Sequence, residues 1–154
     1  MRIYLDNCCY NRPYDDQRQI RIHLETEAKL HIQEMIKDGK IELVCSFVSR
    51  FENSENSNIY NKDSIERFFQ YAVEYINDEF FDDILFHANE LRKQGIKIKD
   101  AAHLACAIKA KCDYFVTTDN RFLNRYNGNE IVICNPLTLL QIIERENNAK
   151  HKRD

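Results

Sequence analysis

Apolar residues recur at intervals of three and four along several stretches of the chain, which is the spacing of one face of an α-helix. The clearest stretch is 19–37, where Ile20, Leu24 and Ala28 follow this spacing and Gly39 then marks the end of a helix. The same spacing predicts further helices at about 46–53, 62–76, 82–93, 100–111 and 137–144. We expect the two helices on either side of residue 80 to form a helical hairpin.

Short apolar runs between these helices have the length of buried β-strands. They lie at residues 2–6, 41–45, 114–118 and 131–134. Because strands and helices alternate, we predict an α/β fold: an α/β/α sandwich with a mostly parallel, doubly wound sheet of four to five strands. The length fits a single domain, expected at 1–146, and the polar residues 147–154 are expected to form a loose tail.

Composition narrows the kinds of protein that fit this fold. The six cysteines show no C-x-x-C spacing and lie beside apolar residues, so we expect free, buried thiols and a cytoplasmic location. No segment has the length and apolar character of a signal peptide or a membrane span. The net charge of −3 argues against passive nucleic-acid binding. It argues less against a nuclease whose metal ions offset acidic residues where the phosphate lies.

Four acidic residues stand where a sheet of this kind binds its ligands, beyond the carboxyl ends of the strands. Asp6 ends the first predicted strand, Asp119 ends the third, and Glu52 follows the second by about two turns of helix. Asp100 begins the helix that leads to Asp119. Converging carboxylates repel one another unless a cation joins them, and Mg²⁺ or Mn²⁺ prefers such oxygen ligands. Attack of a metal-activated water on a phosphodiester is the chemistry that this arrangement favours.

Four segments around these acids have a recognisable form. They are Ile3-Tyr4-Leu5-Asp6-Asn7, Ser49-Arg50-Phe51-Glu52, Lys99-Asp100-Ala101-Ala102-His103-Leu104-Ala105 and Asp113-Tyr114-Phe115-Val116-Thr117-Thr118-Asp119. Together they resemble the PIN family of ribonucleases, which includes the VapC-type toxins of bacterial toxin–antitoxin pairs. The resemblance covers almost the whole chain, and the last two segments are its most specific part.

The resemblance implies a PIN-like fold and a divalent-metal-dependent endoribonuclease that uses Mg²⁺ or Mn²⁺. It assigns metal binding and catalysis to Asp6, Glu52, Asp100 and Asp119, with polar support from Asn7, Thr117 and Thr118. It also implies single-stranded or looped RNA as substrate, a small antitoxin that covers an apolar helical groove, and a homodimer. Asn120 and Arg121 follow Asp119 where some relatives have another acid, so the number of metal ions, one or two, stays open.

Simpler interpretations of the same acids stay open beside this one. Asp100 and Asp119 each stand near a predicted helix start, where an Asp commonly caps the helix. Glu55 lies close to Glu52 and competes with it for the second position. A separate group of acids at 78–83 is expected to be a solvated helix start rather than a metal site.

Basic residues near the predicted site are candidates for contacting the RNA backbone. Lys97 and Lys99 come immediately before Asp100, and Arg12 lies in the loop after Asp6. His103 is three residues past Asp100 and is either a further RNA contact or, as we expect, a packed and hydrogen-bonded histidine.

Two other functions fit parts of the sequence. A phosphatase with an aspartate nucleophile would have Asp-x-Asp after the first strand, but Cys8 occupies the second of these positions. The remaining alternative is a catalytically inactive PIN-like module that binds protein or RNA, against which the presence of all four acids argues.

Overall fold

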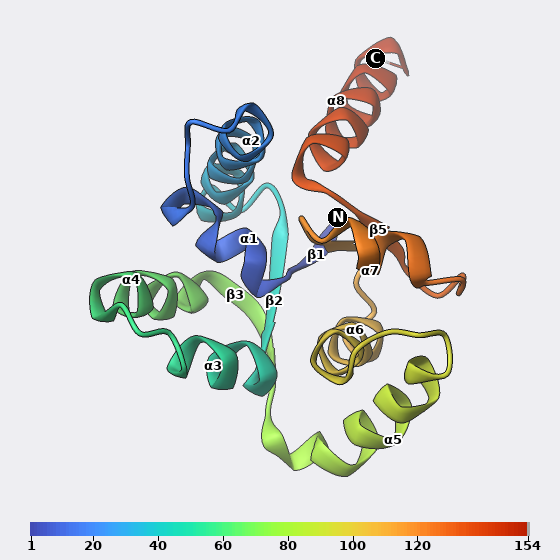
Figure 1. The fold of residues 1–154 in the computed structure, drawn as a ribbon. Coiled ribbons are helices and arrows are strands. Elements are labelled where there is room, and N and C mark those ends of the chain that lie inside the picture. Colours follow the sequence, from blue (N-terminus) through green and yellow to red (C-terminus); the bar gives the residue numbers. More distant parts are fainter. Residues whose placement is uncertain (154) are drawn as a thin grey trace.

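The computed structural model describes residues 1–153 and shows one parallel sheet between two layers of helices (Figure 1). The strands are β1 (Arg2–Leu5), β2 (Glu42–Ser46), β3 (Ala72–Ile76), β4 (Tyr114–Val116) and β5 (Val132–Cys134). Their order across the sheet is β3-β2-β1-β4-β5, and each neighbouring pair is parallel. The predicted doubly wound α/β fold is therefore confirmed, with five strands.

Helices connect the strands and cover both faces of the sheet. They are α1 (Asn7–Asn11), α2 (Ile20–Lys37), α3 (Phe47–Ser54), α4 (Ile59–Phe68), α5 (Phe81–Arg92), α6 (Ile98–Lys109), α7 (Asn120–Arg125) and α8 (Pro136–Arg153). The helices predicted at 19–37, 46–53, 82–93 and 100–111 are confirmed as α2, α3, α5 and α6. Gly39, predicted to end α2, and Gly95, which follows α5, both have positive φ, which favours glycine.

The hydrophobic core is divided by the sheet, and β1 contributes to both halves because its side chains alternate between the faces. Tyr4 packs on one face with residues of α5 and α6, and its ring stacks on that of Phe115 in β4 with ring centroids 5.4 Å apart. Ile3 and Leu5 pack on the other face with residues of α2, α4 and α8. The central strand is thereby buried on both sides, as a strand in a parallel α/β sheet must be.

The helix predicted over 62–76 is wrong in its second half, and so is the helical hairpin. The helix α4 ends at Phe68, a 3₁₀ turn follows at Phe69–Tyr71, and the chain then forms the edge strand β3. The apolar residues of this short segment fit both a helical and an extended pattern, and only pairing with β2 decides between them. A strand needs this partner, whereas the spacing of residues along the sequence describes only one segment at a time.

The C-terminal helix is longer than the predicted 137–144. It runs from Pro136 to Arg153, so that 147–153, expected as a loose tail, is helical although exposed. This segment contains no Gly or Pro, and the basic residues of its last turn interact favourably with the helix dipole. The last residue of the expected tail, Asp154, lies outside the described residues. Among residues 1–153 no helix is long and apolar enough to cross a membrane.

The strand order places a topological switch point at β1. From β1 the chain moves outward through β2 and β3 on one side, and it returns to pair β4 with β1 on the other side before adding β5. Ligands of such sheets bind in the crevice beyond the carboxyl ends of the two strands at this point. Those ends are Leu5 of β1 and Val116 of β4, which are register partners.

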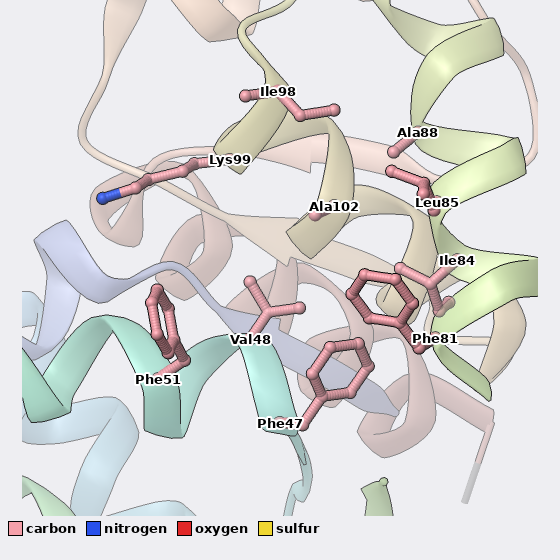
Figure 2. Close-up of a pocket in the computed structure, with 10 residues that line it drawn as sticks. All are labelled: Phe47, Val48, Phe51, Phe81, Ile84, Leu85, Ala88, Ile98, Lys99 and Ala102. Atoms are coloured by element: carbon pink, nitrogen blue, oxygen red, sulfur yellow. The ribbon is translucent and has the colours of Figure 1, made fainter. Parts of the chain in front are cut away.

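An apolar groove of about 340 Å³ lies where α3, α5 and α6 meet (Figure 2). Its lining includes Phe47, Val48, Phe51, Phe81, Leu85 and Ile98. Four of these aromatic and aliphatic side chains are strongly exposed, since Phe51 is 61%, Phe81 52%, and Leu85 and Ile98 each 41% accessible. Lys99 is the charged residue of the lining, at the end of the groove nearest to Phe51 in Figure 2.

Candidate active site

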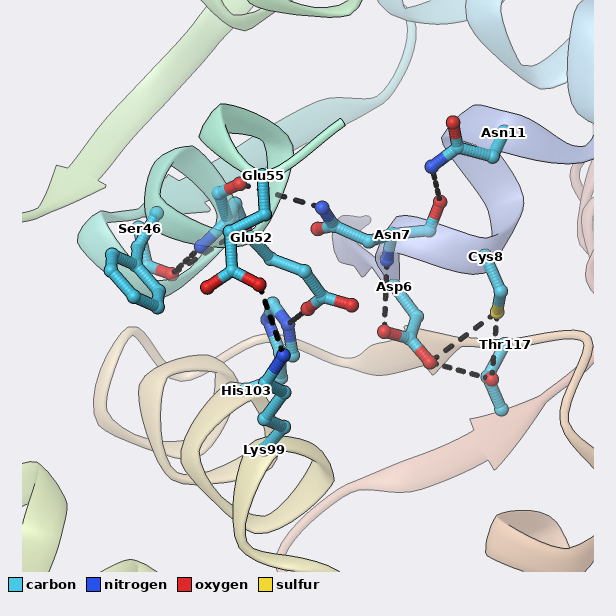
Figure 3. Close-up of polar contacts among 12 residues, drawn as sticks. Asp6, Asn7, Cys8, Asn11, Ser46, Glu52, Glu55, Lys99, His103 and Thr117 are labelled. Carbon is cyan, nitrogen blue, oxygen red and sulfur yellow. Dashed lines mark hydrogen bonds and ion pairs between the residues drawn. The ribbon is translucent and has the colours of Figure 1, made fainter. Parts of the chain in front are cut away.

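Asp6 lies directly after β1 at the switch point and is 5% exposed. Its backbone N–H donates to the carbonyl of Val116 at 2.9 Å, which joins the end of β1 to the end of β4. Its Oδ1 accepts from the backbone N–H of Asn7 at 2.8 Å, while its Oδ2 accepts from the Thr117 hydroxyl at 2.8 Å (Figure 3). The position and direction of this carboxylate are therefore set by the residues that follow the two neighbouring strands β1 and β4.

Thr117 connects Asp6 to Asp119. While its hydroxyl donates to Asp6, its Oγ1 accepts from the Asp119 backbone N–H at 3.1 Å. Asp119 also caps α7, because its Oδ1 accepts from the N–H groups of Arg121 at 2.9 Å and Phe122 at 3.3 Å. The cap interpretation of Asp119 therefore holds. Asp119 uses Oδ1 for both cap hydrogen bonds, and Oδ2 takes no part in the cap.

Asp100 lies in the first turn of α6 but does not cap it, because the N-cap position is Lys97. The pKa of the Asp100 carboxyl is raised from 3.8 to about 6, mainly by burial and next by the charges of Asp6 and Asp119. Glu52 raises it further, and His103 opposes the shift. The side chains of the predicted acids are therefore close enough to repel one another around Asp100.

Glu52 is held by His103 rather than left free in the crevice. The Nε2 of His103 lies 2.5 Å from Oε2 of Glu52, and the His103 side chain is completely buried. Burial alone would raise the pKa of Glu52, but the hydrogen bond and charge of His103 outweigh it and lower that pKa. Burial would likewise lower the pKa of His103, and Glu52 with the nearby Asp6 charge raises it instead. The competing Glu55 is directed to Lys99, with Nζ and Oε2 3.7 Å apart.

A buried polar network behind His103 was not predicted. The Tyr4 hydroxyl lies 2.7 Å from Nδ1 of His103, 2.6 Å from the Ser46 hydroxyl and 2.8 Å from the Ser49 hydroxyl. The sequence contained one signal for it: Tyr4 alternates with the apolar residues of β1, and a buried tyrosine hydroxyl needs a hydrogen-bond partner. The identity of that partner depended on the packing of α6 against β1.

The predicted supporting residues lie around Asp6. Asn7 is 3% exposed, and its Nδ2 donates to the Ser49 carbonyl at 3.4 Å. Its Oδ1 is buried without a hydrogen-bond partner among the described residues. Thr118 is also buried, and its backbone N–H donates to the thiol of Cys8 at 3.3 Å. Cys8 contacts Asp6 Oδ2 at 3.4 Å and was not among the predicted site residues.

The predicted RNA contacts have different surroundings. His103 is wrong as an RNA contact, because it is fully buried in the hydrogen-bonded position that we expected as its simpler role. Arg12 binds Asp15 at 3.0 Å and the buried Glu25 at 2.9 Å, so its charge is already neutralised within the protein. Lys97 and Lys99 are exposed at the start of α6.

The chemistry of the crevice fits a divalent cation, although its acidic side chains stand too far apart to enclose one. Among residues 1–153 no three His, Cys, Asp or Glu side chains lie close enough to hold a metal ion as they stand. The available donors are nevertheless oxygens of Asp6, Glu52, Asp100 and Asp119, and Asn7, the residue after Asp6, has a buried amide oxygen without a hydrogen-bond partner among the described residues. Hard oxygen ligands of this kind suit Mg²⁺ or Mn²⁺, which would also relieve the repulsion around Asp100.

Comparison with known proteins agrees with the geometry. No curated protein matches the chain. The crystal structure of VapBC2 from Rickettsia felis, bound to a DNA fragment from their promoter, contains a similar chain, with a TM-score of 0.53 and 18% identity. The alignment covers 88% of this chain and 98% of that one, which shows a shared fold. The sequence pattern of the PIN domain matches residues 24–128, a range that includes Glu52, Asp100 and Asp119 but begins after Asp6. The chain therefore belongs to the PIN-domain family.

Proposed function

We propose that the protein is a divalent-metal-dependent endoribonuclease in which Asp6, Glu52, Asp100 and Asp119 bind Mg²⁺ or Mn²⁺. PIN domains are generally nucleases. The observation that carries the proposal is the placement of Asp6 and Asp119 beyond the carboxyl ends of β1 and β4, where the Thr117 hydroxyl hydrogen-bonds to both residues. The pKa of Asp100, raised to about 6 by burial and by the charges of the other three acids, agrees with this placement. Residues from four separate segments thus create an electrostatic cost that a bound cation would remove.

The residues of the crevice have different parts in this proposal. When bound, a divalent cation supplies an activated water for hydrolysis of the phosphodiester and charge for the leaving oxygen. Thr117 orients Asp6 and Asp119 together through its single hydroxyl. Asp100 lies in the first turn of α6, and the charges of Asp6, Asp119 and Glu52 oppose its ionisation, so a cation would stabilise its charged form.

The RNA backbone is expected to approach along the start of α6. Both Lys97 and Lys99 are exposed there. Lys97 lies three residues before Asp100, and Lys99 lies immediately before it. Lysines in this position would attract phosphates without reading base identity. The pairing of Lys99 with Glu55 at 3.7 Å is exposed and therefore weak enough to exchange for a phosphate.

RNA cleavage with and without added metal tests the function. The wild-type protein should cleave single-stranded RNA with Mg²⁺ or Mn²⁺ and should lose activity when EDTA removes the metal. Asp6→Asn keeps the size of the side chain and removes its charge, so it should reduce cleavage at least about a hundredfold, a loss of roughly 3 kcal/mol of transition-state stabilisation. Cleavage that continues in EDTA, or that is equal in Asp6→Asn, would contradict the mechanism. Failure of the wild-type protein to cleave any RNA would favour an inactive binding module.

We further propose that the protein is the toxin of a toxin–antitoxin pair and that the apolar groove receives the antitoxin. The fold match to a chain of VapBC2 supports this partner class. The groove and the crevice share α3 and α6, which carry Glu52 and Asp100. A segment with apolar side chains in the groove could therefore extend a basic side chain into the acidic crevice and block it.

Co-expression tests this partner. The product of a short reading frame next to the gene is the candidate, and it should form a complex that inhibits cleavage. Phe51→Arg places a charge on a strongly exposed groove residue and should weaken this complex at least tenfold, whereas Tyr60→Arg, on an 86% exposed residue outside the groove, should not. An unchanged affinity of Phe51→Arg would place the antitoxin elsewhere.

A further inference from the structure

The buried histidine of α6 has a role that neither metal binding nor RNA contact explains. His103 is 0% exposed, and both of its ring nitrogens are engaged, Nε2 with Glu52 and Nδ1 with Tyr4. In Figure 3 the Glu52 carboxylate lies between the His103 ring and Asp6, with its second oxygen pointing toward Asp6. One oxygen is thus held by the histidine and the other is presented to the crevice.

Glu52 needs such a support more than the other acids do. Asp6 is bound by Asn7 and Thr117, and Asp119 is bound by the start of α7. Glu52 has a longer side chain, is 32% exposed, and has His103 as its hydrogen-bond partner among the described side chains. Without the histidine, repulsion from the neighbouring carboxylates would favour turning Glu52 outward to solvent.

The network behind His103 keeps the ring in one orientation. The Tyr4 hydroxyl touches Nδ1 of His103 and the hydroxyls of Ser46 and Ser49. Ser46 caps α3, the helix that carries Glu52, by accepting from the Ser49 backbone N–H at 3.2 Å. The same buried cluster therefore connects β1, the start of α3 and α6, the three elements that deliver Asp6, Glu52 and Asp100.

We propose that His103 is a positioning residue of the metal site, which holds Glu52 so that its free carboxylate oxygen faces Asp6. The inference deepens the proposed function and rests on it, since it assumes that Glu52 contributes to metal binding. Hydrogen bonds to ligating carboxylates are a common means of orienting them, and their loss typically reduces metal affinity or activity about 10- to 100-fold.

Two conservative substitutions separate positioning from packing. His103→Gln places an amide nitrogen near the position of Nε2 and can still donate to Glu52, whereas His103→Asn is too short to reach it but can still meet Tyr4. We expect the Mn²⁺ affinity of the purified protein, measured by calorimetry without RNA, to fall at least about tenfold in His103→Asn and only a few-fold in His103→Gln. Equal affinities in both variants and the wild type would overturn the proposal, as would an equal loss in both variants.

A double-mutant cycle tests whether the histidine acts through Glu52. In a Glu52→Ala background, His103→Asn should cause no further loss of Mn²⁺ affinity, whereas additive losses would contradict the proposal. Circular dichroism of each variant checks that the fold is retained.

A measurement on the wild-type protein covers the case in which His103→Asn fails to fold. Addition of Mg²⁺ should shift the imidazole ¹⁵N signals of His103 through Glu52 while the exposed His23 and His31 stay unchanged. If Mg²⁺ binds and the His103 signals do not move, the proposal fails. A wild-type protein that binds metal but cleaves no RNA would contradict the proposed nuclease function and leave these binding results to decide the positioning role.

Discussion

Two groups of acidic residues differ sharply in how close they lie along the sequence and in how exposed they are in the fold. Asp78, Glu79, Asp82 and Asp83 lie within six residues of one another and are all exposed, the first two in the 3₁₀ turn Asp78–Phe80 and the others in the first turn of α5. The four acids of the crevice come from segments more than forty residues apart, except for Asp100 and Asp119, and the fold brings the other three near enough for their charges to act on Asp100. The group that looks denser in the sequence is the one that water surrounds.

The difference shows that burial and mutual repulsion, rather than local acid content, mark the candidate site. Acids at the start of a helix interact with its dipole and with water, so their proximity costs little. Asp100, in contrast, has a pKa of about 6 because burial and the other crevice acids oppose its ionisation. Each group should therefore respond to a different measurement when it is neutralised.

The largest expected contrast is in catalysis. Asp100→Asn should reduce metal-dependent RNA cleavage at least about a hundredfold, because it removes a carboxylate from the proposed metal site. The matched control Asp83→Asn makes the same chemical change on an exposed side chain of α5 and should cleave within about twofold of wild type. The two variants compared in one assay at equal protein concentration provide the measurement. Similar losses in both would mean that the crevice has no special role.

The second contrast is in stabilisation by metal. Mn²⁺ at about 100 times its dissociation constant should stabilise the wild-type protein by about 2.7 kcal/mol, which raises Tm by roughly 5–10 °C for a chain of this size. Asp83→Asn should show the same increase, and Asp100→Asn should show little or none. Differential scanning calorimetry with Mn²⁺ and with EDTA measures it. A full increase in Asp100→Asn would remove Asp100 from the metal site.

The third contrast is the pH dependence of the metal-free protein. Asp100 has a higher pKa in the fold, about 6, than its ordinary 3.8, so the folded protein holds this proton more tightly than the unfolded chain does. The tighter binding of this proton adds to the free energy of unfolding. That addition is complete at low pH and is lost as pH rises from about 4 to about 6.

Asp100→Asn should therefore become more stable relative to wild type over that pH range, and the difference should level off above it. Because the carboxylate is partly open to water, which screens its charge, we expect a difference on the order of 1 kcal/mol. Urea unfolding in EDTA at pH 4, 5, 6 and 7 measures it. For Asp83→Asn, the difference in unfolding free energy from wild type should not increase with pH. A difference for Asp100→Asn that is the same at every pH would contradict the mutual repulsion of the crevice acids.

The fold was largely predictable because most of its elements carry a complete local pattern. The helix α2 combines apolar spacing with Gly39 at its end, and the structure matches the prediction almost to the residue. The strand β3 was missed because Ala72–Ile76 owes its extended conformation to pairing with β2 at the edge of the sheet. Its exposed positions include the apolar Val73 and the aromatic Tyr75, so hydrophobicity along the segment does not follow its burial and contains little information about the partner.

The candidate site divides in the same way. Asp6 and Asp119 could be placed from the sequence because Asp6 directly follows β1 and Asp119 comes three residues after β4, and strand ends meet in a parallel sheet. The link between Glu52 and His103 could not, since it depends on how α3 and α6 pack against each other. The position of His103 on the helix face of Asp100 was visible, but its partner lies 51 residues away in the chain.

The smallest expected contrast concerns stability at the start of α5. Here the exposed acids have an effect on stability and none on catalysis. Asp82 and Asp83 stand in its first turn, where negative charge interacts favourably with the helix dipole. Neutralising both, as Asp82→Asn/Asp83→Asn, should reduce the unfolding free energy by about 0.3–1 kcal/mol in low salt and by less at 1 M NaCl, because salt screens exposed charges. Urea unfolding at the two salt concentrations provides the measurement, and RNA cleavage should stay unchanged. A loss of cleavage in this variant, with the fold intact, would show that the exposed acids belong to the functional site, and the distinction between the two groups would fail.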